Sequence, residues 1–370
     1  MNNTGPLLAL VFLILLPLFG VTESPDSTPH NAPARQQDTS NNDASDKHIS
    51  DKGTGQAEQP GLGSIIGWRF KRLWNKEIRH QAALVRQTRP EPQIVELQPL
   101  GQREAELVWL GHSTVLVRHG DSTILTDPHL GDQASPVSWA GPERVTPPAM
   151  TADELPFIDF VVISHNHYDH LDLPTLENLA RRTGPEGQKT LFLAPEGLAG
   201  WLKKKGIENA LELAWWESRK LQGWEITATP VQHHSGRGMF DKDKTRWAGW
   251  SFKQGEFGFF FAGDTGYSSV FAQIGKRLGP FSLAAIPIGG YEPRSLMHFA
   301  HVNPEEAVKI HQDIGAQRSV GIHWGTFLGL TDEPFNEPPA RLASAAEAAG
   351  LSDGDFNALA VGGQLQITTN

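Results

Sequence analysis

The sequence of 370 residues contains no cysteine. It therefore has no disulfide framework, no thiol nucleophile and no thiolate ligand for a metal. Positive charge is also scarce: 32 Lys and Arg oppose 42 Asp and Glu, and the formal net charge is -10. An acidic chain argues against a polyanion-binding groove as the main purpose of the molecule, so we expect no nucleic-acid partner. With 39% hydrophobic residues, the chain is long enough for one large domain or two small ones.

The sequence also has no uninterrupted hydrophobic run of the length that an ordinary transmembrane helix needs. The apolar segment from Leu7 to Val21 is broken only by Pro17 and Gly20, which suits a signal-peptide core and is short for a membrane span. We predict that residues 1–24 are a signal peptide or an N-terminal membrane anchor, although no basic residue precedes the run. Residues 25–62 are poor in large apolar side chains and are predicted to be a disordered linker. We expect an exported or membrane-associated protein, in the bacterial periplasm or on the periplasmic face of the inner membrane.

Residues 63–105 are predicted to form a basic arm that precedes the main domain, residues 106–370. In its first part, apolar and basic side chains alternate at helical spacing; the apolar set is Ile66, Phe70, Leu73 and Trp74, and the basic set is Arg69, Lys71, Arg72, Lys76 and Arg79. The pattern predicts a basic amphipathic helix between Gly63 and Arg89. Such a helix can lie on an anionic membrane surface or dock its apolar face on the main domain, and the sequence favours neither.

The most informative stretch follows an apolar run, residues 157–163, which is typical of a buried strand. There the pattern H-x-H-x-D-H places His165, His167, Asp169 and His170 within six residues. Alternate side chains of an extended loop point the same way, so one pair of ligands can serve one metal and the second pair a neighbouring metal. Imidazole and carboxylate ligands without thiolate suit zinc, with iron or manganese as substitutes. A polar loop with chance histidines is the alternative that this density of ligands disfavours.

Ligand-type residues also follow the ends of other predicted strands. His233 follows residues 224–231, Asp264 follows residues 257–262, and His323 follows residues 319–322. A rigid sheet would present these side chains and the H-x-H-x-D-H residues at one edge. Asp264 stands between glycines, and its carboxylate could bridge two cations.

Two further polar residues stand at strand ends. Asp127 follows residues 122–126, where it either orients a ligand histidine or caps a turn. His112 follows Gly111, and we predict a structural role for it or a supporting contact behind the ligands.

The motifs resemble the metallo-β-lactamase fold superfamily and, within it, the N-acylphosphatidylethanolamine-hydrolysing phospholipase D family. The resemblance extends from about residue 107 to residue 350 and rests on residues 109–115, 125–128, 163–172, 259–267, 283–289, 291–294, 301–307 and 322–327. The H-x-H-x-D-H pattern alone is typical only of the superfamily, and the later stretches are more specific.

This resemblance implies an α/β fold, the four-layer αβ/βα sandwich, with two zinc ions between its sheets. It implies that one zinc is held by His165, His167 and His233, the other by Asp169, His170 and His323, and that Asp264 bridges both. His301 is similar to an additional active-site histidine of the family. The sequence departs from the family at His234, where relatives usually have an aromatic residue.

The implied activity is hydrolysis of N-acylphosphatidylethanolamine to an N-acylethanolamine and phosphatidate, a phosphoric diester cleavage of the phospholipase D type. Phospholipid is then the substrate and a membrane surface a partner. Asp264 would also steer the proton of the nucleophile. His301 would assist the leaving group or bind phosphate, unless it merely precedes a helix that starts at Pro304. Arg294 is a candidate phosphate contact.

Two other functions stay open. The same metals serve carbonyl attack, so a related hydrolase of an ester, a lactone, a β-lactam or a soluble phosphodiester is one alternative. The other is a non-enzymatic, exported, metal-binding module associated with a membrane. The sequence also permits a homodimer. Product analysis separates the enzymatic alternatives, and loss of the metal without loss of any activity would support the non-enzymatic module.

Overall fold

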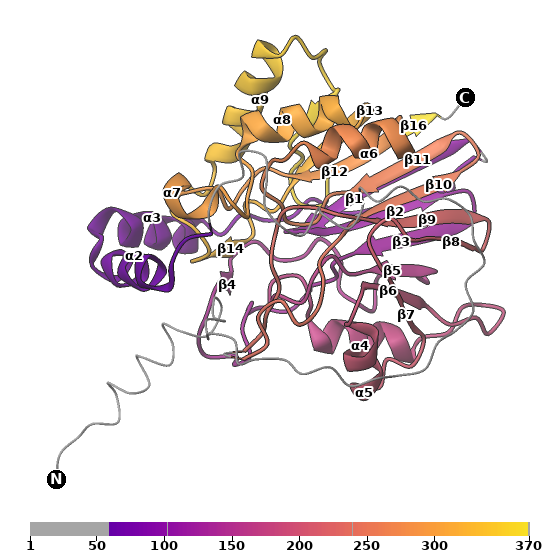
Figure 1. Ribbon diagram of the computed structural model, residues 1–370, viewed down its shortest axis with the longest axis horizontal. Helices are drawn as coiled ribbons and strands as arrows, with labels where there is room; N and C mark the ends of the chain where they lie inside the picture. The colour runs from indigo at the N-terminus through magenta and orange to yellow at the C-terminus, as the bar shows by residue number, and fades with distance from the viewer. Residues whose placement is uncertain (1–58, 102, 239, 369–370) are drawn as a thin grey trace, which may run out of the picture.

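The computed structural model describes residues 59–101, 103–238 and 240–368 (Figure 1). The predicted signal or anchor, residues 1–24, lies outside the described residues, and so does the linker up to residue 58. Among the helices that are described, none is both long enough and apolar enough to cross a membrane.

Two seven-stranded mixed sheets form the centre of the protein. The first sheet has the strand order β16 (Gln364–Thr368), β1 (Glu104–Gly111), β2 (Thr114–His119), β3 (Ser122–Thr126), β5 (Phe160–Val162), β6 (Leu191–Pro195) and β7 (Ala210–Leu213). The second has the order β15 (Phe356–Asn357), β13 (Ala316–Ile322), β12 (Phe281–Pro287), β11 (Phe257–Phe261), β10 (Gly249–Gln254), β9 (Trp224–Thr229) and β8 (Ser218–Leu221). In each sheet one half is antiparallel and the other parallel.

Helices cover the outer face of each sheet (Figure 1). The first sheet is covered by α4 (Leu173–Arg181) and α5 (Ala199–Lys204), and the second by α6 (Val270–Leu278), α8 (Pro304–Asp313) and α9 (Glu337–Ala348). A short ribbon of β4 (Glu143–Arg144) and β14 (Phe327–Leu328) and the single turn α7 (Arg294–Met297) lie near the end of the sandwich that carries the arm. The predicted four-layer αβ/βα sandwich is confirmed.

Alternation along the strands explains the layers. In β1, Leu107 and Trp109 face the core between the two sheets, whereas Val108 and Leu110 face α4 and α5. All five residues of β11 are buried, because a strand with both faces covered needs apolar side chains on both. The central strands, such as β5, β11 and β12, therefore appear in the sequence as largely apolar runs, and polar residues follow where they end.

The arm forms two helices rather than one. Helix α2 (Leu62–Trp74) ends at Asn75, whose side chain accepts hydrogen bonds from the first backbone N–H groups of α3 (Lys76–Thr88). An asparagine in this position satisfies donors that a helix start leaves open, and so favours a new helix over a continued one.

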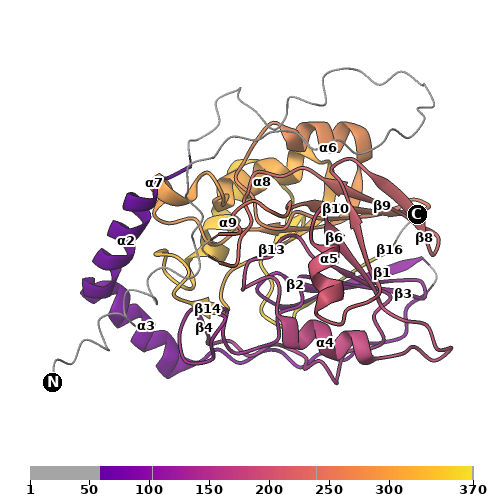
Figure 2. The ribbon, with the colours of Figure 1, turned by 60° about the horizontal axis from the view of Figure 1, so that its bottom comes forward.

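The arm also docks on the main domain. Trp68 Nε1 donates to the Asp332 carboxylate, and Arg72 donates to the carbonyls of Gly329 at 2.9 Å and Thr331 at 2.6 Å. Figure 2 shows α2 and α3 as a strap along the side of the sandwich that carries β4 and β14. The face of α2 that carries Trp68 and Arg72 is therefore in contact with the main domain.

Candidate metal centre

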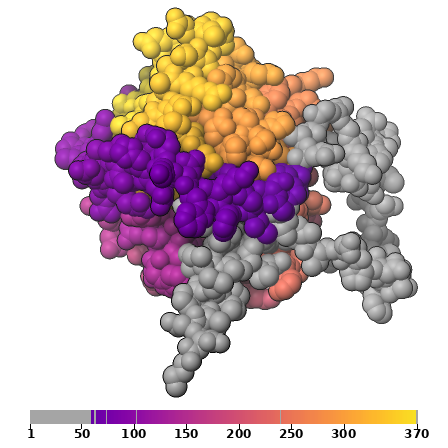
Figure 3. All heavy atoms as spheres, turned by 90° about the vertical axis from the view of Figure 1, so that its left-hand side faces the viewer, coloured from indigo at the N-terminus to yellow at the C-terminus, as the bar shows by residue number. Residues whose placement is uncertain are grey.

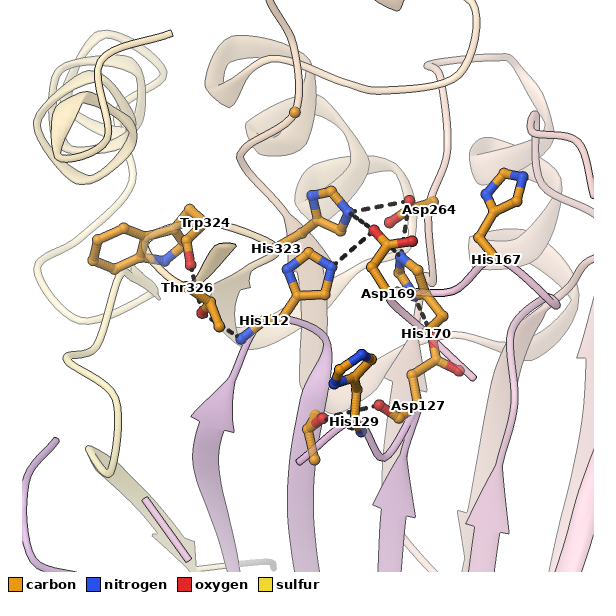
Figure 4. A network of polar contacts seen from close by, with 12 residues as sticks. His112, Asp127, His129, His167, Asp169, His170, Asp264, His323, Trp324 and Thr326 are labelled. Carbon is orange, nitrogen blue, oxygen red and sulfur yellow. Dashed lines mark hydrogen bonds and ion pairs between the residues drawn. The ribbon is translucent and has the colours of Figure 1, made fainter. Parts of the chain in front are cut away.

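The seven predicted ligands meet at one end of the two sheets. His165, His167, Asp169 and His170 lie just beyond β5 of the first sheet. The other three follow strands of the second sheet: His233 after β9, Asp264 after β11 and His323 after β13. Figure 4 shows several of these side chains converging above the strand ends. The carboxyl ends of strands from both sheets thus supply one cluster, mostly out of contact with solvent.

Three histidines form the first group. The Nδ1 atom of His167 lies 2.8 Å from His165 Nε2 and 3.3 Å from His233 Nε2. His233 Nδ1 lies 3.0 Å from the Ala300 carbonyl, and His165 Nδ1 lies 2.8 Å from Ser164 Oγ, so each of these atoms carries the ring proton. Their Nε2 lone pairs therefore face His167.

Burial lowers the pKa of all three rings well below the ordinary value and keeps them neutral. Converging lone pairs of neutral imidazoles are what a metal cation requires.

Asp169, His170 and His323 form the second group with His112. The Asp169 Oδ2 atom lies 3.1 Å from His112 Nε2, 3.4 Å from His170 Nε2 and 3.6 Å from His323 Nε2 (Figure 4). The ligand atoms of these four residues lie within 4.8 Å of one another. His112, predicted to have a structural or supporting role, is therefore within reach of the second metal as well as of Asp169.

Asp264 stands between the two groups. Its Oδ2 atom lies 3.0 Å from His170 Nε2 and 3.1 Å from His323 Nε2, and 3.8 Å from His233 Nε2. Burial opposes its charge, but the neighbouring rings of His170 and His323 hold the pKa of this carboxyl well below the usual range. The carboxylate has the position that a bridge between two cations needs.

The geometry of the ring nitrogens around Asp264 suits metal coordination better than hydrogen bonding. Despite the short distances, His170 Nε2 and His323 Nε2 make no well-directed hydrogen bond within the described residues, nor does Asp264 Oδ1. Buried polar atoms without such partners are costly, and several of them gathered at one point indicate a site for a cation. The donor set of imidazole nitrogens and carboxylate oxygens fits two metal ions of the zinc, iron or manganese type.

Asp127 supports the ligands from below. Its carboxylate accepts hydrogen bonds from the backbone N–H and the hydroxyl of Ser164, and it lies 2.7 Å from His170 Nδ1. The contact places the proton of His170 on Nδ1 and turns Nε2 toward the centre. Its backbone has φ of +32°, so the residue also makes the turn that ends β3. Both roles that the sequence left open for Asp127 coexist.

Arg237 was not anticipated from the sequence. It is largely buried, and its guanidinium donates to the carbonyls of Asn166 and Leu171, both at 2.9 Å, while it lies 3.8 Å from the centre of the Tyr168 ring. These contacts fix the backbone of the metal-binding loop, residues 165–170, at both of its ends. A single arginine between Gly236 and Gly238 carries no pattern that would predict this role.

The two remaining predicted residues lie beside the centre. His301 Nδ1 is 3.8 Å from Asp264 Oδ2, and burial lowers the pKa of the ring to about 4. The helix-start role belongs instead to Asn303, whose side chain and that of Glu306 form a capping box for α8. Arg294 donates to the His301 carbonyl at 2.7 Å and pairs with Glu306. These contacts position the His301 loop, and the phosphate contact of Arg294 stays a prediction.

His234, the departure from the family pattern, is half-buried beside the first group. Its ring centre lies 4.8 Å from those of both His167 and His233. Burial lowers its pKa to about 4, so it packs as a neutral ring where an aromatic side chain is expected.

Comparison with known proteins assigns the family. Residues 122–324, more than half of the chain, match the beta-lactamase superfamily domain. The chain belongs to the metallo-β-lactamase superfamily. This superfamily member is 38% identical to the N-acyl-phosphatidylethanolamine-hydrolyzing phospholipase D 1 of Caenorhabditis elegans over 78% of the chain and 83% of the relative. It is also 38% identical to an uncharacterized protein of Mycobacterium tuberculosis, over 74% of the chain and 73% of that protein.

Solved structures share the fold at lower identity. A metallo hydrolase from Ignicoccus hospitalis aligns with a TM-score of 0.54 and 23% identity, over 72% of the chain and 100% of that protein. A diiron beta-hydroxylase from Streptomyces venezuelae aligns with a TM-score of 0.52 and 20% identity, over 73% of the chain and 55% of that protein. Because one fold carries different reactions, the reaction of this superfamily member has to be argued from its site.

Asp127→Asn should weaken metal binding while leaving the fold intact. The amide keeps the shape but loses the charge that orients His170, and such changes cost roughly 10- to 100-fold in metal affinity. Competition with a chromophoric chelator measures the change, and Asp121→Asn, at an exposed turn, is the matched control. Equal affinity of both variants would contradict the supporting role of Asp127.

Metal removal should destabilise the protein and be reversible. The chelated chain is expected to take up two equivalents of zinc, and its melting temperature should rise, because binding to the folded state alone adds about 2.7 kcal/mol at 100 times the Kd. Elemental analysis and calorimetry check both outcomes. His165→Ala should retain one tight equivalent and the exposed His80→Ala two; two equivalents in both variants would show that the first group is not a metal site.

Proposed function

We propose that the protein is a zinc-dependent phosphodiesterase that hydrolyses N-acylphosphatidylethanolamine to an N-acylethanolamine and phosphatidate. The observation that carries this proposal is a buried two-metal donor set with an apolar pocket directly beside it, in a chain that is 38% identical to a relative named for this reaction. We choose zinc over softer metals because the donor set has no sulfur ligand. Iron and manganese are the alternatives, and elemental analysis of the purified protein distinguishes them from zinc.

The reaction needs a nucleophile, charge stabilisation and a proton for the leaving group. Two cations held by the first and second groups would supply a water of lowered pKa and positive charge near the phosphoryl oxygens. Water oxygen forms a bond to phosphorus, the bond from phosphorus to the ethanolamine oxygen breaks, and the released alcohol takes up a proton.

Residues of the chain itself would orient the nucleophilic water and contact the leaving group. Asp264 is ionised and central, so its carboxylate can accept a hydrogen bond from the nucleophilic water and orient it. His301 is neutral, lies beside Asp264 and lines the apolar pocket, where its ring N–H can donate a hydrogen bond to the departing oxygen while water supplies the proton. Arg294 holds the backbone of that histidine in place.

Product analysis tests the reaction. The zinc-loaded protein, incubated with N-acylphosphatidylethanolamine, should release N-acylethanolamine and phosphatidate, identified by mass spectrometry. His165→Ala and Asp264→Asn should lower kcat/KM roughly 100-fold or more, because each removes charge or a ligand where the transition state needs it. His80→Ala serves as the control. Release of fatty acid would point to ester hydrolysis, and turnover that survives complete metal removal would exclude the mechanism.

We further propose that the arm contacts the membrane that holds the substrate. Phe70 and Trp74 are 56% and 70% exposed, although they belong to the same helix that docks through Trp68 and Arg72. Neighbouring basic residues favour an anionic surface, and exposed aromatic side chains favour its interface. Figure 3 displays the arm in indigo, lying across one face of the molecule.

Replacement of Phe70 and Trp74 by serine should weaken binding to anionic vesicles while hydrolysis of a soluble phosphodiester continues. The changes remove apolar surface that contributes about 25 cal/mol per Å² when buried in the interface. Vesicle sedimentation measures binding, and Ile94→Ser, at a side chain 90% exposed outside the arm helices, is the control. Unchanged sedimentation of the double variant would argue against membrane contact through α2.

A further inference from the structure

Two cavities reach the metal centre, and α2 contributes residues to both of them. The first, called here the narrow pocket, has a volume of about 80 Å³ and touches His167, His234 and His301. The second, called the wide cavity, has a volume of about 670 Å³ and touches His112 and His323. One cavity therefore meets the first ligand group, and the other meets the second.

One face of helix α2 lines both cavities. Ile65 and Trp68 line the narrow pocket, and Arg69 and Arg72 line the wide cavity. The four positions are spaced as i, i+3, i+4 and i+7, so they share one face, and successive turns of that face meet different cavities. Trp68 and Arg72 dock the helix on the 329–332 loop, which fixes it over both cavities.

The two cavities differ in chemistry as well as in size. Apart from its histidines, the narrow pocket is walled near the centre by Leu296, Met297 and Phe299. The wide cavity combines apolar side chains, such as Ile78 and Phe335, with four arginines and four carboxylates, among which Arg72 pairs with Asp332 and Arg86 with Glu143. The narrow pocket suits part of a single hydrocarbon chain, and the much larger wide cavity suits a bulkier group.

We propose that the two cavities sort the two arms of the phosphodiester substrate. The narrow pocket takes the part of the N-acyl chain nearest the leaving ethanolamine, and the wide cavity takes the diacylglycerol arm, while the charged phosphoryl group between the two arms lies at the metal centre. This inference rests on the proposed function. The two ester arms diverge from one phosphorus atom, so a site that cleaves only one of them must place each arm on a definite side.

His301 agrees with this assignment. It lines the narrow pocket and does not line the wide cavity, so the group that can assist the departing oxygen stands on the side assigned to the leaving arm. The opposite placement would put the glycerol oxygen beside His301 and favour cleavage to diacylglycerol.

A matched pair of variants tests the sorting. Ile65→Trp obstructs the narrow pocket and Ile78→Trp the wide cavity, and Ile94→Trp is the control in neither. Two ratios of kcat/KM are measured in detergent micelles. The first compares long with short N-acyl chains on the same diacylglycerol, and the second compares diacyl with monoacyl glycerol on the same N-acyl chain.

Ile65→Trp should lower the first ratio roughly 10-fold or more and leave the second unchanged, and Ile78→Trp should do the reverse, since one or two methylene contacts are worth about that much. Both ratios moving together, neither moving, or the two effects exchanged would overturn the sorting. If tryptophan prevents folding, as judged by thermal denaturation, Ile65→Phe and Ile78→Phe replace the pair. A wild-type protein that releases no N-acylethanolamine from any of these substrates refutes the proposed function itself, which is a separate result.

Discussion

The metal centre depends on one electrostatic arrangement, a carboxylate buried among imidazole rings. Asp264 is 2% exposed, and an isolated charge in such a place would be strongly unfavourable. The arrangement is sustained because rings of the second group face the carboxylate at close to 3 Å and because two cations would complete the balance. Two of the neighbouring rings are themselves oriented from behind, His170 by Asp127 and His233 by a backbone carbonyl. Without those outer contacts the donors would not converge.

The backbone around the centre is held in uncommon conformations. His112, Asp127 and His323 have positive φ angles of +51°, +32° and +63°. A residue with a side chain costs about 1–2 kcal/mol in this region. Apolar cores on both faces of each sheet hold the strands from which these residues turn away, so the sandwich can maintain the strain. Glycine meets the same demand at Gly263, where a Cβ atom would lie 2.6 Å from the Ser164 side chain.

Helix α2 of the arm both contacts the main domain and exposes aromatic side chains. One side of α2 binds the main domain and lines both cavities, and the same helix exposes aromatic side chains to the surroundings. A contact between these exposed side chains and a lipid surface would bring the cavities to the place where the substrate lies. Substrate entry and substrate sorting then depend on the same thirteen-residue helix.

The sequence by itself determined the fold class and which ligand-type residues would gather at one sheet edge, because strands buried on both faces are apolar runs and these residues stand where the runs end. It could not determine that His112 would come within reach of the second metal, or that Arg237 would hold the metal-binding loop, because neither residue belongs to a local pattern. Nor could local spacing decide that α2 docks on the 329–332 loop and lines two cavities. Those outcomes depend on contacts between residues up to 264 positions apart, which exist only once the two sheets have packed.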